Sequence, residues 1–188
     1  MSETENSNRY VFILLTRYND RMSKVILRMM GGQYVHASLG LDDSYSQFYS
    51  FNKKGFRLEH PLQPHHREVP CALYRIKISD AEHARLLEFL NHFEKYSTQY
   101  SYSWFGLILC RLHIAHKARK RYFCTQFVAE ALAASGVAKI WKSSSLFLAD
   151  DFVQIENADL QFQGTLGGLE NWVKGSRTYH ITSLRMNY

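Results

Sequence analysis

Residues 122–128 are Tyr-Phe-Cys-Thr-Gln-Phe-Val, a stretch that places a cysteine at the start of a predicted helix. Apolar side chains recur at helical spacing between residues 124 and 134, and Gly136 is a natural end for this helix. A thiol at a helix N-terminus lies at the positive end of the dipole, beside backbone N–H groups without helical partners. Because such groups can also stabilise an oxyanion, the pattern favours Cys124 as a nucleophile.

A histidine from much earlier in the chain is the candidate base. His36 lies within a predicted strand over residues 34–41, and a rigid strand is a good support for a catalytic side chain. A Cys–His pair is an activated nucleophile that forms an acyl-enzyme with a carbonyl compound. From the residues alone, the simpler interpretation is that Cys124 is a small buried hydrophobic residue and His36 a core histidine.

Three segments together resemble a known family. They are His-Ala-Ser-Leu-Gly-Leu-Asp at 36–42, Tyr-Ser-Phe and Gly-Phe within 49–56, and Phe-Cys-Thr-Gln-Phe-Val-Ala-Glu-Ala-Leu at 123–132. In this order they resemble the permuted NlpC-like cysteine hydrolases, a group that includes the YiiX/YebB-like proteins and is related to lecithin:retinol acyltransferases. In the unpermuted papain-like arrangement the cysteine helix precedes the histidine strand, whereas here the histidine comes first. The resemblance covers roughly residues 10–188.

The resemblance implies a fold and an activity. The fold is α+β, a circularly permuted papain-like (NlpC-type) domain with an antiparallel sheet packed against helices. The activity is hydrolysis of an amide or peptide-like bond, with Cys124 and His36 as catalytic residues and no cofactor or metal. The alternatives are a lipid acyltransferase or (thio)esterase of the lecithin:retinol acyltransferase type, and a non-catalytic binding module.

The family also has a third polar residue, which orients the imidazole. If the hairpin turns at residues 42–43, His36 faces the same side as Gln47, whose side-chain carbonyl can accept the ring N–H. Ser46 and Ser50 are the alternatives if the register slips by one residue. Many relatives have a carboxylate or a histidine at this place, and a glutamine stabilises an imidazolium less strongly.

Substrate-binding residues are expected around the catalytic pair. The predicted set is Tyr34, Ser38, Tyr49 and Tyr122. A second set of aromatic residues either lines a substrate groove or packs in the core: Tyr96, Tyr100, Tyr102 and Trp104.

The bulk properties are those of one compact globular domain. The chain has 188 residues, of which 46% are hydrophobic and 21% charged, so it is long enough for a sizeable core. Residues 1–8 are expected to be a disordered lead-in and residues 9–188 a single catalytic domain. No targeting segment is expected from the polar, acidic first residues, and an odd number of cysteines (three) argues against a disulfide framework. A cytoplasmic location follows as the expectation.

The net charge of +6 bears on partners. The basic segment 111–121 is either a solvated helix end or a cationic rim that attracts an anionic substrate or a phospholipid membrane. The expected substrate is a small peptide-like or acyl compound, including an anionic one. Nucleic-acid binding is not expected, because no recognised module accompanies the charge. Cys110, His113 and His116 recur every three residues, but a structural role is favoured over a zinc site.

The remaining patterns predict the other elements. Strands are predicted at 10–16, 34–41, 45–51, 56–59, 71–78 and 178–184, and helices at 20–30, from 104 onward, at 124–134 and at 149–153. Ser79-Asp80-Ala81-Glu82 is a capping-box pattern that begins a further helix.

Overall fold

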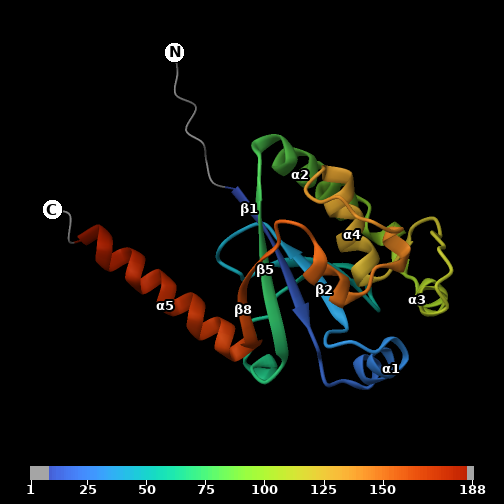
Figure 1. The fold of residues 1–188 in the computed structure, drawn as a ribbon, viewed down its shortest axis with the longest axis horizontal. Coiled ribbons are helices and arrows are strands. Elements are labelled where there is room, and N and C mark those ends of the chain that lie inside the picture. Colours follow the sequence, from blue (N-terminus) through green and yellow to red (C-terminus); the bar gives the residue numbers. More distant parts are fainter. Residues whose placement is uncertain (1–8, 186–188) are drawn as a thin grey trace, which may run out of the picture.

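The computed structural model describes residues 9–185, with side chains up to residue 175, so the predicted lead-in at residues 1–8 lies outside the described residues. The described chain forms a mixed α+β fold in which an antiparallel sheet of six strands packs against helices (Figure 1). The strand order is β4-β3-β2-β1-β5-β8, and β6 and β7 form a separate parallel pair.

The bounds of the elements follow. The strands are β1 (Arg9–Thr16), β2 (His36–Gly40), β3 (Phe48–Asn52), β4 (Gly55–Glu59), β5 (Pro70–Ile78), β6 (Ser101–Tyr102), β7 (Arg121–Tyr122) and β8 (Asp159–Thr165). The α-helices are α1 (Arg21–Met30), α2 (Asp80–Lys95), α3 (Trp104–Arg111), α4 (Cys124–Ser135) and α5 (Leu166–Arg185). The 3-10 helices are η1 (Pro64–His66), η2 (Ser97–Gln99), η3 (Ser144–Leu146) and η4 (Ala149–Gln154).

Strand β1 is the central element of the core, because it pairs with β2 on one side and β5 on the other. Alternate residues of a strand face opposite sides of the sheet. Ile13 belongs to the main core, to which α2 and α4 contribute, whereas Leu14 packs in a second cluster with Leu169 of α5. Burial on both faces explains why β1 is continuously apolar rather than alternating.

Polar side chains begin three of the helices. Asp20 accepts hydrogen bonds from two backbone N–H groups of α1, and Ser103 accepts one at the start of α3. Ser79 and Glu82 form the predicted capping box of α2. The helix α4 ends, as predicted, at Gly136, which has a left-handed conformation with φ of 80°. The capping box of α2 and the end of α4 at Gly136 are therefore confirmed, while the caps at Asp20 and Ser103 are seen only in the structure.

We expect Gly136→Ala to destabilise the protein by about 1 kcal/mol, because an L side chain is strained at this left-handed φ. The added Cβ would also lie 3.0 Å from Arg85 Nη2. Urea unfolding followed by circular dichroism measures the change. Gly175→Ala is the matched control, since nothing lies within 4 Å of a Cβ there and its φ is not positive. Equal stability of Gly136→Ala and the wild type would contradict the expectation.

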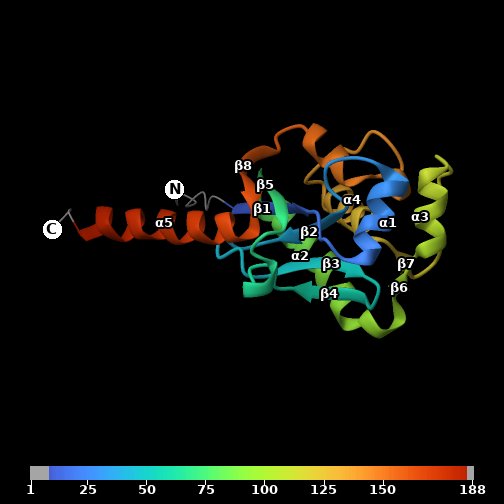
Figure 2. The same cartoon turned by 90° about the horizontal axis from the view of Figure 1, so that it is seen from below.

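One prediction about the C-terminal part and one about the hairpin were wrong. Residues 178–184 are not a strand but belong to α5, which runs away from the body of the protein (Figure 2). The final strand of the sheet is instead β8, an edge strand whose exposed residues lack a clear apolar alternation. The predicted strand 45–51 begins later, because the chain between β2 and β3 is a loop over residues 41–47 rather than a tight turn.

No helix in the part of the chain that the structure describes is both long enough and apolar enough to span a bilayer.

Candidate active site

The helix α4 begins at Cys124, as predicted. No side chain caps its first turn. Phe123 occupies the N-cap position and cannot accept a hydrogen bond through its ring. The first helical bond runs from the Phe127 N–H to the Phe123 carbonyl, at 3.0 Å. The N–H groups of residues 124–126 therefore precede the helical hydrogen bonds, which is the arrangement that an oxyanion site needs.

The structure brings His36 and Cys124 together. His36 is the first residue of β2, and α4 packs against this strand. Both side chains line the same cleft and are close enough for Cys124 to act on the pKa of the ring, and Cys124 Sγ lies 3.9 Å from the carbonyl oxygen of Val35. The predicted pair of thiol and imidazole therefore forms, although 88 positions separate the two residues in the sequence.

Glu59 is the third member of the site. Its Oε2 lies 2.8 Å from His36 Nε2, and its Oε1 accepts a hydrogen bond of 3.1 Å from Asn52 Nδ2. The side chains of His36 and Glu59 are only 14% and 18% exposed, which makes the ion pair a largely buried one. Because Nε2 is held by Glu59, Nδ1 is the ring nitrogen that is left for exchange of a proton with Cys124.

Charge interactions favour a protonated imidazole. Burial alone would lower the pKa of His36, but the charges of Glu59 and Cys124 and the hydrogen bond to Glu59 hold this pKa well above the ordinary 6.5. Burial likewise opposes ionisation of Glu59, yet His36 and the hydrogen bond from Asn52 lower the pKa of Glu59 below 4.5. The site thus holds an imidazolium between a carboxylate and a sulfur atom.

The structure places Gln47, the predicted third residue, away from this position. Gln47 is exposed in the loop before β3, and the hydrogen-bond partner of His36 Nε2 is Glu59. A turn at residues 42–43 would pair Leu39 with Ser46, whereas the structure pairs Leu39 with Tyr49, a shift of three residues. An odd shift turns every side chain to the other face of the sheet, so the orientation argument for Gln47 fails.

The two alternatives to Gln47 have other partners. Ser46 is exposed, and its hydroxyl bonds to the Ser44 hydroxyl at 2.7 Å. Ser50 is buried and donates to the Ala37 carbonyl at 2.7 Å. The sequence did carry a signal for Glu59, since it is a carboxylate at the end of the short strand predicted at 56–59.

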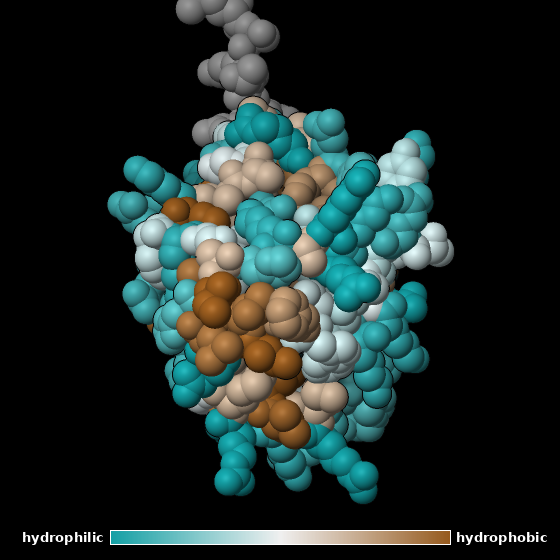
Figure 3. Space-filling model, turned by 90° about the vertical axis from the view of Figure 1, so that its right-hand side faces the viewer, coloured by the Kyte–Doolittle hydropathy of each residue, from teal (hydrophilic) through white to brown (hydrophobic). Residues whose placement is uncertain are grey.

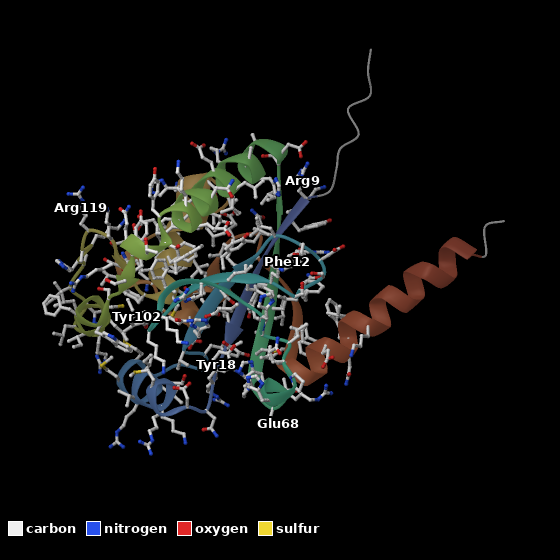
Figure 4. The ribbon with its side chains drawn as sticks, turned by 180° about the vertical axis from the view of Figure 1, so that it is seen from behind. Arg9, Phe12, Tyr18, Glu68, Tyr102 and Arg119 are labelled. Carbon is white, nitrogen blue, oxygen red and sulfur yellow. The ribbon has the colours of Figure 1, made fainter. Side chains whose placement is uncertain are left out.

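A cleft of about 510 Å³ leads to the pair. Its lining includes His36, Cys124 and Glu59 at the catalytic end. The walls come from several elements and include Tyr18, Met22, Ile26, Phe51, Tyr102 and Trp104. Figure 4 labels Tyr18, from the loop after β1, and Tyr102, from β6. The thiol is thus reachable from the cleft, although Cys124 as a whole is only 4% exposed.

The predicted substrate-binding residues do not line this cleft. Tyr34 is in the core and lines a smaller pocket of about 220 Å³ that also reaches Cys124. Ser38 is buried, and its hydroxyl lies 3.5 Å from the Leu14 carbonyl. Tyr49 stacks on Phe56, and the Tyr122 hydroxyl donates to Glu130 at 3.3 Å. These four side chains support the fold around the site and do not form the wall of the cleft.

Of the second set of aromatic residues, two are in the cleft. Tyr102 and Trp104 line it with their ring centroids 4.5 Å apart, whereas Tyr100 packs on Phe93 and Tyr96 on His92. Burial and the charge of Cys124 raise the pKa of Tyr102 far above its ordinary value. Its hydroxyl therefore remains a hydrogen-bond donor at neutral pH.

Comparison of the chain with protein-family models, with curated protein sequences and with solved structures finds no match. The described residues contain no group of three or more histidine, cysteine or acidic side chains placed to bind a metal ion, the Cys110, His113 and His116 set included. Assignment of a function therefore depends on the geometry of the site.

Proposed function

We propose that the chain is a cysteine-dependent hydrolase that acts through an acyl-enzyme on Cys124. The observation that carries the proposal is the cluster of Cys124, His36 and Glu59 in one cleft, with Glu59 hydrogen-bonded to His36 and the thiol at an uncapped helix N-terminus. A buried ion pair of this kind costs desolvation energy, and stability alone does not account for it. A nucleophile, a base and a group that orients the base are what acyl transfer requires.

In the proposed reaction, Cys124 Sγ attacks the substrate carbonyl carbon, and the carbonyl electron pair moves onto its oxygen. Backbone N–H groups at the start of α4 stabilise this oxyanion. As the intermediate collapses, the bond to the leaving group breaks, and the His36 proton passes to that group. His36 then takes a proton from water, whose hydroxide oxygen attacks the thioester and releases the acid and the free thiol. Glu59 keeps the ring oriented throughout.

We further propose that the fold is the circularly permuted papain-like one. The histidine strand β2 precedes the cysteine helix α4 in sequence, and the two elements pack together. Glu59 fills the role of the third polar residue that the resemblance implies, although it ends β4 rather than lying on the strand directly after the histidine strand. The placement of the three side chains supports the same interpretation as the sequence resemblance.

The bond that we propose as substrate is an amide or peptide-like one. The cleft has polar groups along one wall, among them Asn52, Lys53 and His60, which suit a peptide-like substrate with an anionic group. A lipid ester or thioester is the second candidate, and the apolar wall formed by Met22, Ile26 and Trp104 favours it. The same nucleophile and base serve both bonds.

An activated ester tests the proposed nucleophile without knowledge of the substrate. We expect p-nitrophenyl acetate to acetylate Cys124 at least roughly tenfold faster than Cys71 or Cys110. All three thiols are buried, but burial raises the pKa of Cys71 to about 12 and that of Cys110 to about 11. Peptide mass spectrometry after short incubation measures each rate. Equal acetylation of the three thiols would refute the proposal.

A further inference from the structure

One side of the protein exposes an unusual number of large apolar side chains. They come from α1, α3 and the C-cap of α3 and are Met22, Val25, Trp104, Phe105, Ile108 and Leu112, which we name the α1–α3 face. Phe105 and Leu112 are each 60% exposed, and Figure 3, which views the side where these helices lie, shows apolar side chains gathered there. A contiguous exposed apolar surface on a folded domain usually marks an interaction site.

The two helices form one unit. Leu107 and Cys110 of α3 are buried in a small cluster against Ile26 and Met29 of α1. Arg111 Nε also donates a hydrogen bond of 2.5 Å to the Met29 carbonyl. The inner faces of α1 and α3 pack against each other. The exposed apolar side chains on their outer faces contact no other element of the described fold that would cover them. They are therefore available to a partner outside it.

The two segments that carry this face are basic, and Asp20, which caps α1, lies directly before the first of them. Segments 21–41 and 97–129 contain no Asp or Glu. They carry eight cationic side chains, three in the first (Arg21, Lys24, Arg28) and five in the second (Arg111, Lys117, Arg119, Lys120, Arg121). Lys117 pairs with Glu130, at 3.1 Å, whereas Arg119 points away from the body at this end of the protein (Figure 4). A partner that complements this face would offer apolar groups to its apolar side chains and anionic groups to the cations beside them.

We propose that the α1–α3 face docks on an anionic lipid bilayer. Aromatic and aliphatic side chains that enter the interface, bordered by Lys and Arg that meet lipid headgroups, are the two features of a membrane-surface helix. A second copy of the chain fits less well, since it would bring two sets of like charges together. The occupant is therefore a lipid surface rather than this chain.

The docked orientation has a consequence for the cleft. Met22 and Trp104 belong both to the α1–α3 face and to the lining of the cleft, so the face continues into the cleft that holds Cys124. Docking would set the cleft against the membrane. This inference goes beyond the proposed hydrolase activity, because binding to lipid requires no catalytic step, and the two can be tested separately.

Co-sedimentation of the full chain with vesicles tests the docking. We expect binding to vesicles of phosphatidylcholine with phosphatidylserine, weak binding to phosphatidylcholine alone, and loss of binding in high salt. Arg119→Ala should lower the partition coefficient about fivefold. Ile108→Ser should lower it roughly tenfold by removing apolar area from the interface.

The controls are matched for exposure and for charge. Leu160 of β8 is 50% exposed against 48% for Ile108, so Leu160→Ser removes a similar apolar side chain elsewhere. Lys77→Ala removes an exposed cation from β5. Both controls should bind like the wild type, and Cys124 acetylation should be unchanged in all four variants. Binding that ignores phosphatidylserine, or that falls equally in the controls, would overturn the proposal. So would a wild-type dimer, measured by light scattering, that Ile108→Ser converts to monomer.

Discussion

The His36→Ala variant is expected to react with iodoacetamide at Cys124 roughly 100-fold more slowly than the wild type at pH 6.5. An unpaired cysteine has only about one per cent thiolate at this pH. In the wild type the imidazolium of His36 is held next to Cys124, and its pKa is raised well above 6.5 by Glu59 and Cys124 against the effect of burial. Removal of the ring removes both the base and the positive charge beside the sulfur atom.

The rate is measured by quenched labelling and mass spectrometry of the peptide that contains Cys124. The matched control is His60→Ala, because His60 also lines the cleft but hydrogen-bonds to the Ser46 carbonyl, at 3.1 Å. This control should react like the wild type. If His36→Ala reacted as fast as the wild type, Cys124 and His36 would be neighbours without a catalytic relation, and the simpler core interpretation would stand.

The local part of the site could be predicted from the sequence. The cysteine, the apolar residues at helical spacing after it and Gly136 predicted the bounds of α4 to within one residue. His36 was predicted within a strand and is the first residue of β2. Both predictions depend on short-range patterns, namely helix propensity, capping and alternation, which act within a few residues.

The non-local part could not be predicted from those patterns. Gln47 was chosen because a two-residue turn was assumed after β2, and the loop over 41–47 is longer. Strand β3 pairs with β2 at Leu39 and Tyr49 but with β4 over five positions, so the β3–β4 hairpin carries Glu59 to His36. Register and strand direction depend on long-range packing, which a pattern of residues in one strand does not encode.

The same distinction explains the cleft. Tyr34, Ser38, Tyr49 and Tyr122 were predicted to bind substrate around the catalytic pair. In the structure their side chains pack away from the cleft, whose walls include residues from α1 and from the β3–β4 turn. Ser38 lies two positions from His36 in β2 and shares its face by strand alternation, yet only His36 lines the cleft, so alternation alone does not predict the lining.

The Glu59→Gln variant is expected to lose about 3 kcal/mol of unfolding free energy at pH 6, because one partner of a largely buried ion pair is removed. Glutamine keeps the shape and the hydrogen-bonding capacity of the side chain but not its charge. Urea unfolding at a series of pH values measures the loss. Glu156→Gln changes an exposed carboxylate and is the control for loss of one negative charge.

The pH dependence distinguishes the ion pair from a simple packing effect. The raised pKa of His36 means that its contribution to stability is complete below the ordinary 6.5 and is lost as pH rises through the raised value. The lowered pKa of Glu59 means that its contribution is present above the ordinary 4.5 and is lost as pH falls through the lowered value. The difference between wild type and Glu59→Gln should therefore be largest between about pH 4.5 and 6.5 and should shrink in alkaline solution.

The ring of His36 gives an independent reading of the same interaction. In Glu59→Gln the main opposite charge is gone while burial continues to favour the neutral ring, so the pKa of His36 should fall. Titration of the histidine ring protons by NMR measures this shift directly. A constant loss of stability at every pH, together with an unchanged titration of His36, would mean that Glu59 only fills space at the end of β4. In that case the carboxylate would have no part in holding the proton that the proposed acyl transfer needs.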